Sequence, residues 1–136
     1  MTDSLLINEF IYERISGSEE VQEYIDGRLW PIVAPWTRPE DVHYPFIVYT
    51  RNSVNVSSIT KDCYPVDSVQ FQIDIISSKY NESVSLANII RRLFDGRYFE
   101  TEKMAIGEIK MTAAKESFND ESFIQTLTFT ADVMNV

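Results

Sequence analysis

Residues 66–96, VDSVQFQIDIISSKYNESVSLANIIRRLFDG, decide the fold of this chain. The first part of the stretch alternates strictly between apolar and polar side chains. The apolar set is Val69, Phe71, Ile73 and Ile75, and the polar set is Gln70, Gln72 and Asp74. Because side chains of a strand point to opposite faces in turn, the alternation predicts a strand in a sheet that is covered on one side.

The second part of the stretch changes to a helical period. Asn81 suits the N-cap, Glu82 suits the first turn, where a carboxylate complements the helix dipole, and Gly96 suits the C-terminal end. The apolar positions between them are Val84, Leu86, Ala87, Ile89, Ile90, Leu93 and Phe94. The polar positions are Ser85, Asn88, Arg91, Arg92 and Asp95. We expect this apolar stripe to cover the apolar face of the preceding strand.

The composition indicates one domain of ordinary globular character. With 136 residues, 44% of them hydrophobic, the chain is long enough to bury a core without disulfides or a structural metal. It lacks both an apolar run near the roughly 20 residues of a membrane span and the residue order of a signal peptide. The single cysteine, Cys63, agrees with a reducing compartment. Twenty-one acidic against twelve basic residues give a net charge of -9, which argues against gripping nucleic acid phosphates.

Upstream of this stretch, the sequence predicts helices and then strands. A helix is expected from Thr2 or Asp3 to Gly17, and a short helical turn after Ser18. The acidic residues of that turn, Glu19, Glu20, Glu23 and Asp26, are interpreted as a solvated face rather than a metal site. Residues 28–36, RLWPIVAPW, contain two prolines and therefore suit an edge strand or an extended arm. Trp30 and Trp36 bracket that segment, and packing over the sheet edge and contact with another copy remain equal alternatives.

Residues 44–51 form a β-branched and aromatic strand opened by proline. After it, residues 52–65 carry Val54, Val56 and Ile59 at strand spacing in a polar segment. An apolar stripe without an obvious core to join indicates a protruding binding arm, while a simple twisted hairpin extension remains the alternative.

Downstream, the sequence predicts a polar connection over residues 97–104 and then a hairpin. Residues 105–117 alternate, with Ala105, Gly107, Ile109, Met111 and Ala113 expected on one face. Asn119, Asp120 and Glu121 mark the turn, and residues 122–133 return as a strand. The expected fold class is α+β: a mainly antiparallel sheet of about five strands with two main helices on one face, in the order α-β-β-β-α-β-β.

Catalytic and cofactor motifs are not found in the sequence. A Cys63–His43 pair across a hairpin is sterically allowed, but a loop histidine and an ordinary thiol are the default. The four glycines form no phosphate-binding loop, and one cysteine and one histidine are too few ligands for zinc. Arg91 and Arg92 lie near a helix C-terminus, where cations are favoured, and they also suit contact with an acidic partner.

Several short motifs follow one another along the chain. They are DGRLWP at residues 26–31, Ala34-Pro35, YPFIVY at residues 44–49, the alternating strand with its helix, and the final hairpin. In this order they resemble the phage tail-completion or tail-terminator proteins, which join head and tail. The resemblance implies a single tail-terminator-like domain over residues 1–136, with a protruding arm at residues 52–65. It also implies a non-enzymatic virion protein without cofactors, catalytic residues or bound metal.

The resemblance further implies a ring, expected to be a hexamer, that caps the tail tube of a bacteriophage or prophage and joins it to the head connector. Its partners would be other copies of itself, the tail tube protein and head-tail connector proteins, with no sequence-specific nucleic acid binding and no membrane. DNA would pass through a lumen whose acidic side chains repel it. The protein would be located at the tail end of the virion, and in the host cytoplasm during assembly.

The residues assigned to an oligomer or tail-tube interface are Trp30, Trp36, Val54, Val56, Ile59, Arg91 and Arg92. The alternative function, from a different class, is a small α+β ligand-binding or enzymatic domain with a pocket near His43.

Overall fold

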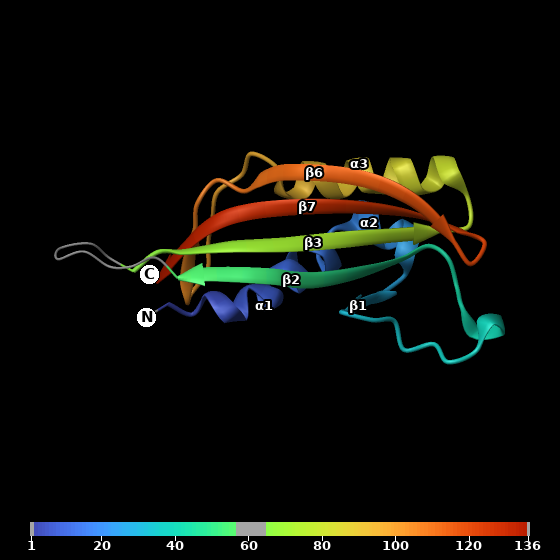
Figure 1. Cartoon of the computed structure of the whole chain (residues 1–136), viewed down its shortest axis with the longest axis horizontal. Coiled ribbons are helices and arrows are strands. Elements are labelled where there is room, and N and C mark those ends of the chain that lie inside the picture. Colours follow the sequence, from blue (N-terminus) through green and yellow to red (C-terminus); the bar gives the residue numbers. More distant parts are fainter. Residues whose placement is uncertain (1, 57–64, 136) are drawn as a thin grey trace.

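The computed structural model describes residues 2–56 and 65–135. Within these ranges it contains three α-helices, two 3-10 turns and one seven-stranded sheet (Figure 1). The elements are η1 (Ser4–Leu6), α1 (Ile7–Ser16), α2 (Glu19–Ile25), β1 (Leu29–Pro31), η2 (Pro39–Asp41), β2 (Phe46–Val56), β3 (Asp67–Ser77), α3 (Tyr80–Phe94), β4 (Phe99–Glu100), β5 (Met104–Ile106), β6 (Lys110–Asn119) and β7 (Ser122–Asn135). The α+β class is therefore confirmed.

The sheet has the strand order β1-β2-β3-β7-β5-β4, and β6 also pairs with β7. The pair β1–β2 is parallel, and the other pairs are antiparallel. Strand β3 pairs along one side of β7, while β5 and β6 pair with successive parts of β7. The last two strands of the predicted order are thus a genuine hairpin. Its turn residues Asp120 and Glu121 both have positive φ, as a tight two-residue connection requires.

The predicted number of five strands is wrong, because two short strands were missed. Residues 97–104 are not merely a polar connection, since β4 lies within them and β5 begins at their end. The predicted strand at 105–117 is interrupted between β5 and β6, where Gly96 N donates to Ile109 O and Ile109 N donates to Arg97 O. This interruption shifts the alternation, so that Met104 and Ile106 are buried in place of Ala105.

The helices lie where the sequence predicted them, but α2 differs in length and α3 in its N-cap. Helix α2 is longer than the expected turn, and its N-cap is the predicted Ser18, whose Oγ accepts a hydrogen bond from Val21 N at 3.3 Å. Helix α3 begins at Tyr80, so Asn81 is not its N-cap; instead Ser77 Oγ donates to Glu82 Oε1 of the first turn at 2.7 Å. None of the described helices combines the length and the apolar character that a bilayer crossing needs.

The core lies between the three helices and one face of the sheet. Phe71 of β3 and Phe129 of β7 stack with ring centroids 5.3 Å apart, and Phe94 of α3 packs on both at 5.7 and 5.5 Å. All three side chains are fully buried. We call this side of the sheet the covered face. The opposite side, which carries Gln72 and Asp74, is called the open face.

Candidate interaction surfaces

Trp30 and Trp36 belong to one aromatic cluster at the β1 edge of the sheet. Their ring centroids are 4.7 Å apart, and Phe46 at the start of β2 lies 4.7 Å from Trp36 and 6.1 Å from Trp30. Both tryptophans are half-buried. Of the two roles considered for them, packing over the sheet edge is present within the chain. Contact with another copy stays a prediction.

The predicted arm begins as a regular extension of two paired strands. Strand β2 continues to Val56, which pairs with Asp67 of β3. Val54 lies opposite Val69 and packs against the core, so the expectation that it has no core to join is wrong. The reason is the register, which places Val54 on the covered face. Val56, by contrast, is 75% exposed.

Two residues of the predicted sites, Ile59 and Cys63, lie outside the described residues. The proposed role of Ile59 in an interface and the Cys63–His43 pair are therefore predictions without a structural counterpart here. His43 itself is exposed, with its ring 6.4 Å from that of Trp36.

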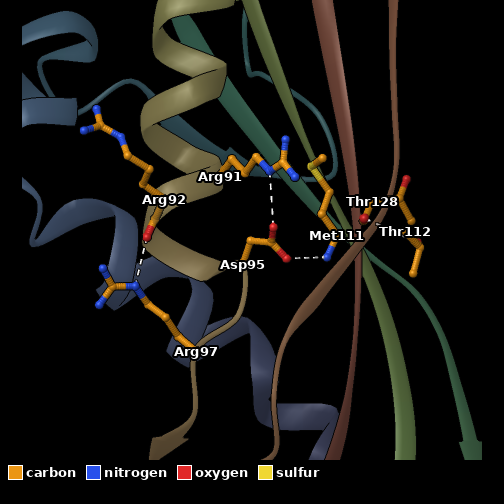
Figure 2. Close-up of polar contacts among 7 residues, drawn as sticks. All are labelled: Arg91, Arg92, Asp95, Arg97, Met111, Thr112 and Thr128. Carbon is orange, nitrogen blue, oxygen red and sulfur yellow. Dashed lines mark hydrogen bonds and ion pairs between the residues drawn. The ribbon is translucent and has the colours of Figure 1, made fainter.

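Arg91 and Arg92 make polar contacts within the chain. Arg91 Nε contacts Asp95 Oδ2 at 3.2 Å, and the Arg92 guanidinium contacts Glu20 Oε1 at 3.1 Å. Arg97 Nε donates to the carbonyl oxygen of Arg92 at 2.9 Å (Figure 2). Arg14 of α1 donates likewise to Leu93 O, and its pKa is lowered by burial and by the nearby Arg97. Arg97 and Arg14 thus satisfy carbonyl groups at the C-terminus of α3, where positive charge is favoured.

Asp95, immediately after α3, links the helix to strand β6. Its Oδ1 accepts a hydrogen bond from Met111 N at 2.9 Å, while Arg91 holds Oδ2 (Figure 2). Met111 borders the bulge at which β6 changes register against β7. The hydrogen bond from Met111 lowers the pKa of Asp95, and Arg91 adds to this effect. The sequence pattern placed Asp95 only on the polar side of the helix.

Asp67, the first residue of β3, links this strand to the amino-terminal segment. It is 6% exposed and accepts hydrogen bonds from Ser4 Oγ at 2.6 Å and from Thr2 Oγ1. These two hydrogen bonds lower the pKa of Asp67 although burial opposes them. The segment before α1 and the end of β7 therefore lie at the end of the sheet where β2 ends and β3 begins (Figure 1). No local sequence pattern identifies this contact, because the partners are more than sixty residues apart in the chain.

The open face of the sheet contains a hollow of about 660 Å³. Its polar floor includes Asp74, whose two oxygens accept hydrogen bonds from Thr126 Oγ1 at 2.6 Å and from Gln72 Nε2 at 2.9 Å. Its apolar lining consists of Ile32, Val33, Ala34, Trp36, Val42, Phe46, Val48, Ile76 and Ile124. Lys115 is the cation among the lining residues, and His43 is not one of them.

The hollow can bind an apolar group, and Asp74, Lys115 and Ser117 are among its polar lining residues. Its carboxylate, Asp74, accepts hydrogen bonds from one neutral donor in β3 itself and one in β7, and no histidine or cysteine lines it among the described residues. In the same part of the chain, no group of three or more His, Cys, Asp or Glu side chains is placed to hold a metal ion.

Comparison with known proteins finds similarity in fold but not in sequence. No protein-family model matches the chain, and neither does any curated protein sequence. A solved chain from the virion of a native gene transfer agent particle superposes with a TM-score of 0.71, covering 91% of each chain at 12% identity. A second solved chain superposes with a TM-score of 0.66 and covers 98% of this chain and 97% of its own, again at 12% identity. At such identity the similarity demonstrates a shared fold and nothing further.

Proposed function

We propose that this chain is a non-enzymatic structural protein of a phage-type virion, which caps the tail tube and joins the tail to the head connector as a hexameric ring. The observation that carries this proposal is the fold shared with a chain of a gene transfer agent virion over 91% of both chains. The sequence resemblance to tail-completion proteins supports the same role from the short motifs at residues 26–31 and 44–49.

Several physical features support a role in assembly. The sheet is long, and its two edges are formed by β1 on one side and by β4 and β6 on the other. Identical subunits can contact each other through two different surfaces. Such contacts form a closed ring when the rotations between neighbours add up to one full turn. The partners on either side of the ring would be the tail tube protein and a head-tail connector protein.

The charge of the chain supports the passage of DNA through such a ring. The net charge of -9 disfavours adhesion to phosphates, so a lumen lined by carboxylates lets a DNA duplex slide through. Replacing lumen-facing carboxylates by amides is expected to slow DNA ejection. Unchanged ejection by such particles would contradict this part of the proposal.

The proposed role is tested by deleting the gene from a strain that produces the particles and imaging the lysate by negative-stain electron microscopy. We expect tails of uneven length and heads without attached tails, because nothing would stop tube growth or form the joint. Restoring the gene in trans is the control. Joined particles of normal tail length in the deletion strain would overturn the proposal.

A second candidate function is the binding of a small ligand in the hollow of the open face, favoured by its apolar lining and polar floor. This alternative was expected near His43, which does not line the hollow, although its neighbour Val42 does. A metabolite that raises the melting temperature of the wild-type protein, but not that of a Val48→Asp variant, would support it. The ring proposal predicts no such metabolite.

A further inference from the structure

The segment after β1 presents two large apolar side chains to solvent. Ile32 has φ +67°, a conformation unfavourable for a β-branched residue, and is 74% exposed. Val33 beside it is 71% exposed. The turn is held by two backbone hydrogen bonds, from Ile32 N to Tyr49 O at 2.9 Å and from Val33 N to Pro31 O at 2.7 Å. The chain thus holds these two side chains on the rim of the open-face hollow, where little of its own structure covers them.

A second exposed apolar patch lies near the turn between β6 and β7. Phe118 near the end of β6 is 61% exposed, and its ring packs on Phe123 with centroids 5.0 Å apart. Phe123 in turn packs on Tyr80 at the start of α3, at 5.5 Å. Tyr80 is fixed from the other side, since its hydroxyl donates to Glu116 at 3.0 Å. We call Phe118, Tyr80 and the exposed Val84 the aromatic patch.

The hollow and the aromatic patch lie on opposite faces of the same sheet, and the hollow extends from Ile32 after β1 to Lys115 and Ser117 of β6. Ile32 follows β1 at one edge, whereas Phe118 belongs to β6 near the other edge (Figure 1). The hollow opens on the open face, whereas the aromatic patch includes two side chains from α3, which packs on the covered face. Two such surfaces on one molecule cannot meet each other. They can meet when the open face of one copy lies against the covered-face side of the next.

An acidic turn lies beside the aromatic patch, and a cation lies in the hollow. The turn next to Phe118 carries Asp120 and Glu121, both exposed. The hollow carries Lys115, which forms none of the ion pairs found among the described residues. The hollow's own carboxylate, Asp74, already accepts hydrogen bonds from Thr126 and Gln72. A partner with an apolar side chain beside acidic groups therefore fits the hollow, and this chain itself has such a surface.

We propose that the open-face hollow of one copy receives the aromatic patch of a second copy, with Phe118 packing against Ile32 and Val33 and the acidic turn near Lys115. The contact is heterologous, so each copy offers one hollow and one patch, and the assembly continues until it closes. The inference rests on the proposed homo-oligomeric ring and identifies its subunit contact. It adds Ile32, Val33, Lys115 and Phe118 to the interface, none of which the sequence had suggested.

The contact is tested with one variant for each surface, Val33→Asp in the hollow and Phe118→Asp in the patch, by light scattering across a concentration series. Each variant alone is expected to weaken association about tenfold or more, because a carboxylate would be buried in an apolar contact. An equimolar mixture of the two retains one intact contact per pair and should form dimers but nothing larger. Leu5→Asp is the matched control, because Leu5 is exposed and lies in η1, away from both surfaces. Circular dichroism spectra verify that every variant folds.

Each alternative result has a definite meaning. Rings of wild-type size from both single variants would overturn the contact while leaving the virion role intact. Loss of association in Phe118→Asp alone would indicate a symmetric contact between two patches and overturn the proposed pairing. A monomeric mixture, or a wild-type protein that never associates, would overturn it as well. The deletion experiment tests the virion role independently of all these outcomes.

Discussion

The two faces of strand β3 differ in what stabilises them. On the covered face, Val69, Phe71 and Ile73 are fully buried beneath the helices. On the open face, Gln72 and Asp74 are half-buried and hydrogen-bonded to each other. Apolar burial is thus the main stabilising term on one face, and hydrogen bonds between neighbouring side chains on the other. One strand can carry both because its side chains alternate.

The open face is itself divided along its length. Near its middle, Asp74 of β3 accepts a hydrogen bond from Thr126 of β7. Two residue pairs further on, Ile76 lies opposite Ile124, and both line the hollow beside the segment after β1. Apolar side chains on a sheet face that stays exposed to water do not favour solubility. This end of the open face is where we propose that a second copy binds.

The largest expected effect comes from truncating the covered face. Phe71→Ala should lower the free energy of unfolding by about 3–5 kcal/mol, since it leaves a cavity among Phe94 and Phe129. Gln72→Ala, the adjacent open-face variant, should cost less than about 1 kcal/mol because no core contact is lost. Urea denaturation of both variants measures the difference. Similar losses of unfolding free energy in the two variants would contradict the proposed difference between the covered and the open face.

A smaller effect is expected from Asp67, the buried carboxylate at the end of the covered face. Asp67→Ala leaves the Ser4 and Thr2 hydroxyls without their acceptor and should cost about 1–3 kcal/mol. Its pKa is lowered in the folded state, so its contribution is present above the unfolded pKa and is lost as the pH falls through the folded pKa.

Stability measured against pH tests this carboxylate separately. The variant Asp67→Asn should lose less stability than the wild type does when the medium is acidified below about pH 4, near the unfolded pKa of aspartate. Asp132→Asn is the matched change, because Asp132 is exposed on the open face one residue pair away. An acid response in Asp67→Asn equal to that of the wild type would contradict the role of Asp67.

Removing the hydrogen bond that links α3 to β6 should have a more local effect on stability. Asp95→Ala removes the acceptor of Met111 N and is expected to cost about 1 kcal/mol, with faster hydrogen exchange at the Met111 amide. Arg91→Ala, which removes only the exposed ion pair, should cost less than about 1 kcal/mol and leave that exchange rate nearly unchanged. Equal exchange rates in the wild type and Asp95→Ala would contradict the link.

The smallest effect on stability is expected at Val56. Because it is 75% exposed, Val56→Asp should change the unfolding free energy by no more than about 0.5 kcal/mol. Val54→Asp should be clearly destabilising, because its side chain packs against the core. Only Val56→Asp therefore tests the predicted arm cleanly. Light scattering of this folded variant should report weaker association, and full assembly would remove Val56 from the interface.

Features with a local cause were predictable from the sequence. The alternation around Phe71 predicted a strand with one covered face, and the helical period around Ile90 predicted α3, because each pattern is complete within one element. The turn at Asp120 followed from its residue types. The break between β5 and β6 was not predictable, since Ile109 bonds to residues 96 and 97, which precede both strands.

In the candidate surfaces, too, the residue types were predictable from the sequence, whereas the contacts between distant segments were not. Trp30 and Trp36 were identified from their residue type, but their position over Phe46 depends on how β1 joins the sheet. The exposure of Ile32 was invisible in the sequence, because an apolar run beside prolines does not reveal a left-handed backbone. Asp67 was missed because its partners come from the far end of the chain.

By itself, the sequence determined which segments form the main helices and strands, which face of β3 is apolar, and that the chain is acidic. Those properties depend on side-chain periodicity and charge, which are local or additive. Tertiary structure alone decided which surfaces stay exposed. Exposure depends on strand order, register and the path of connecting segments, and these bring together residues such as Ile32 and Ile124 that no sequence pattern relates.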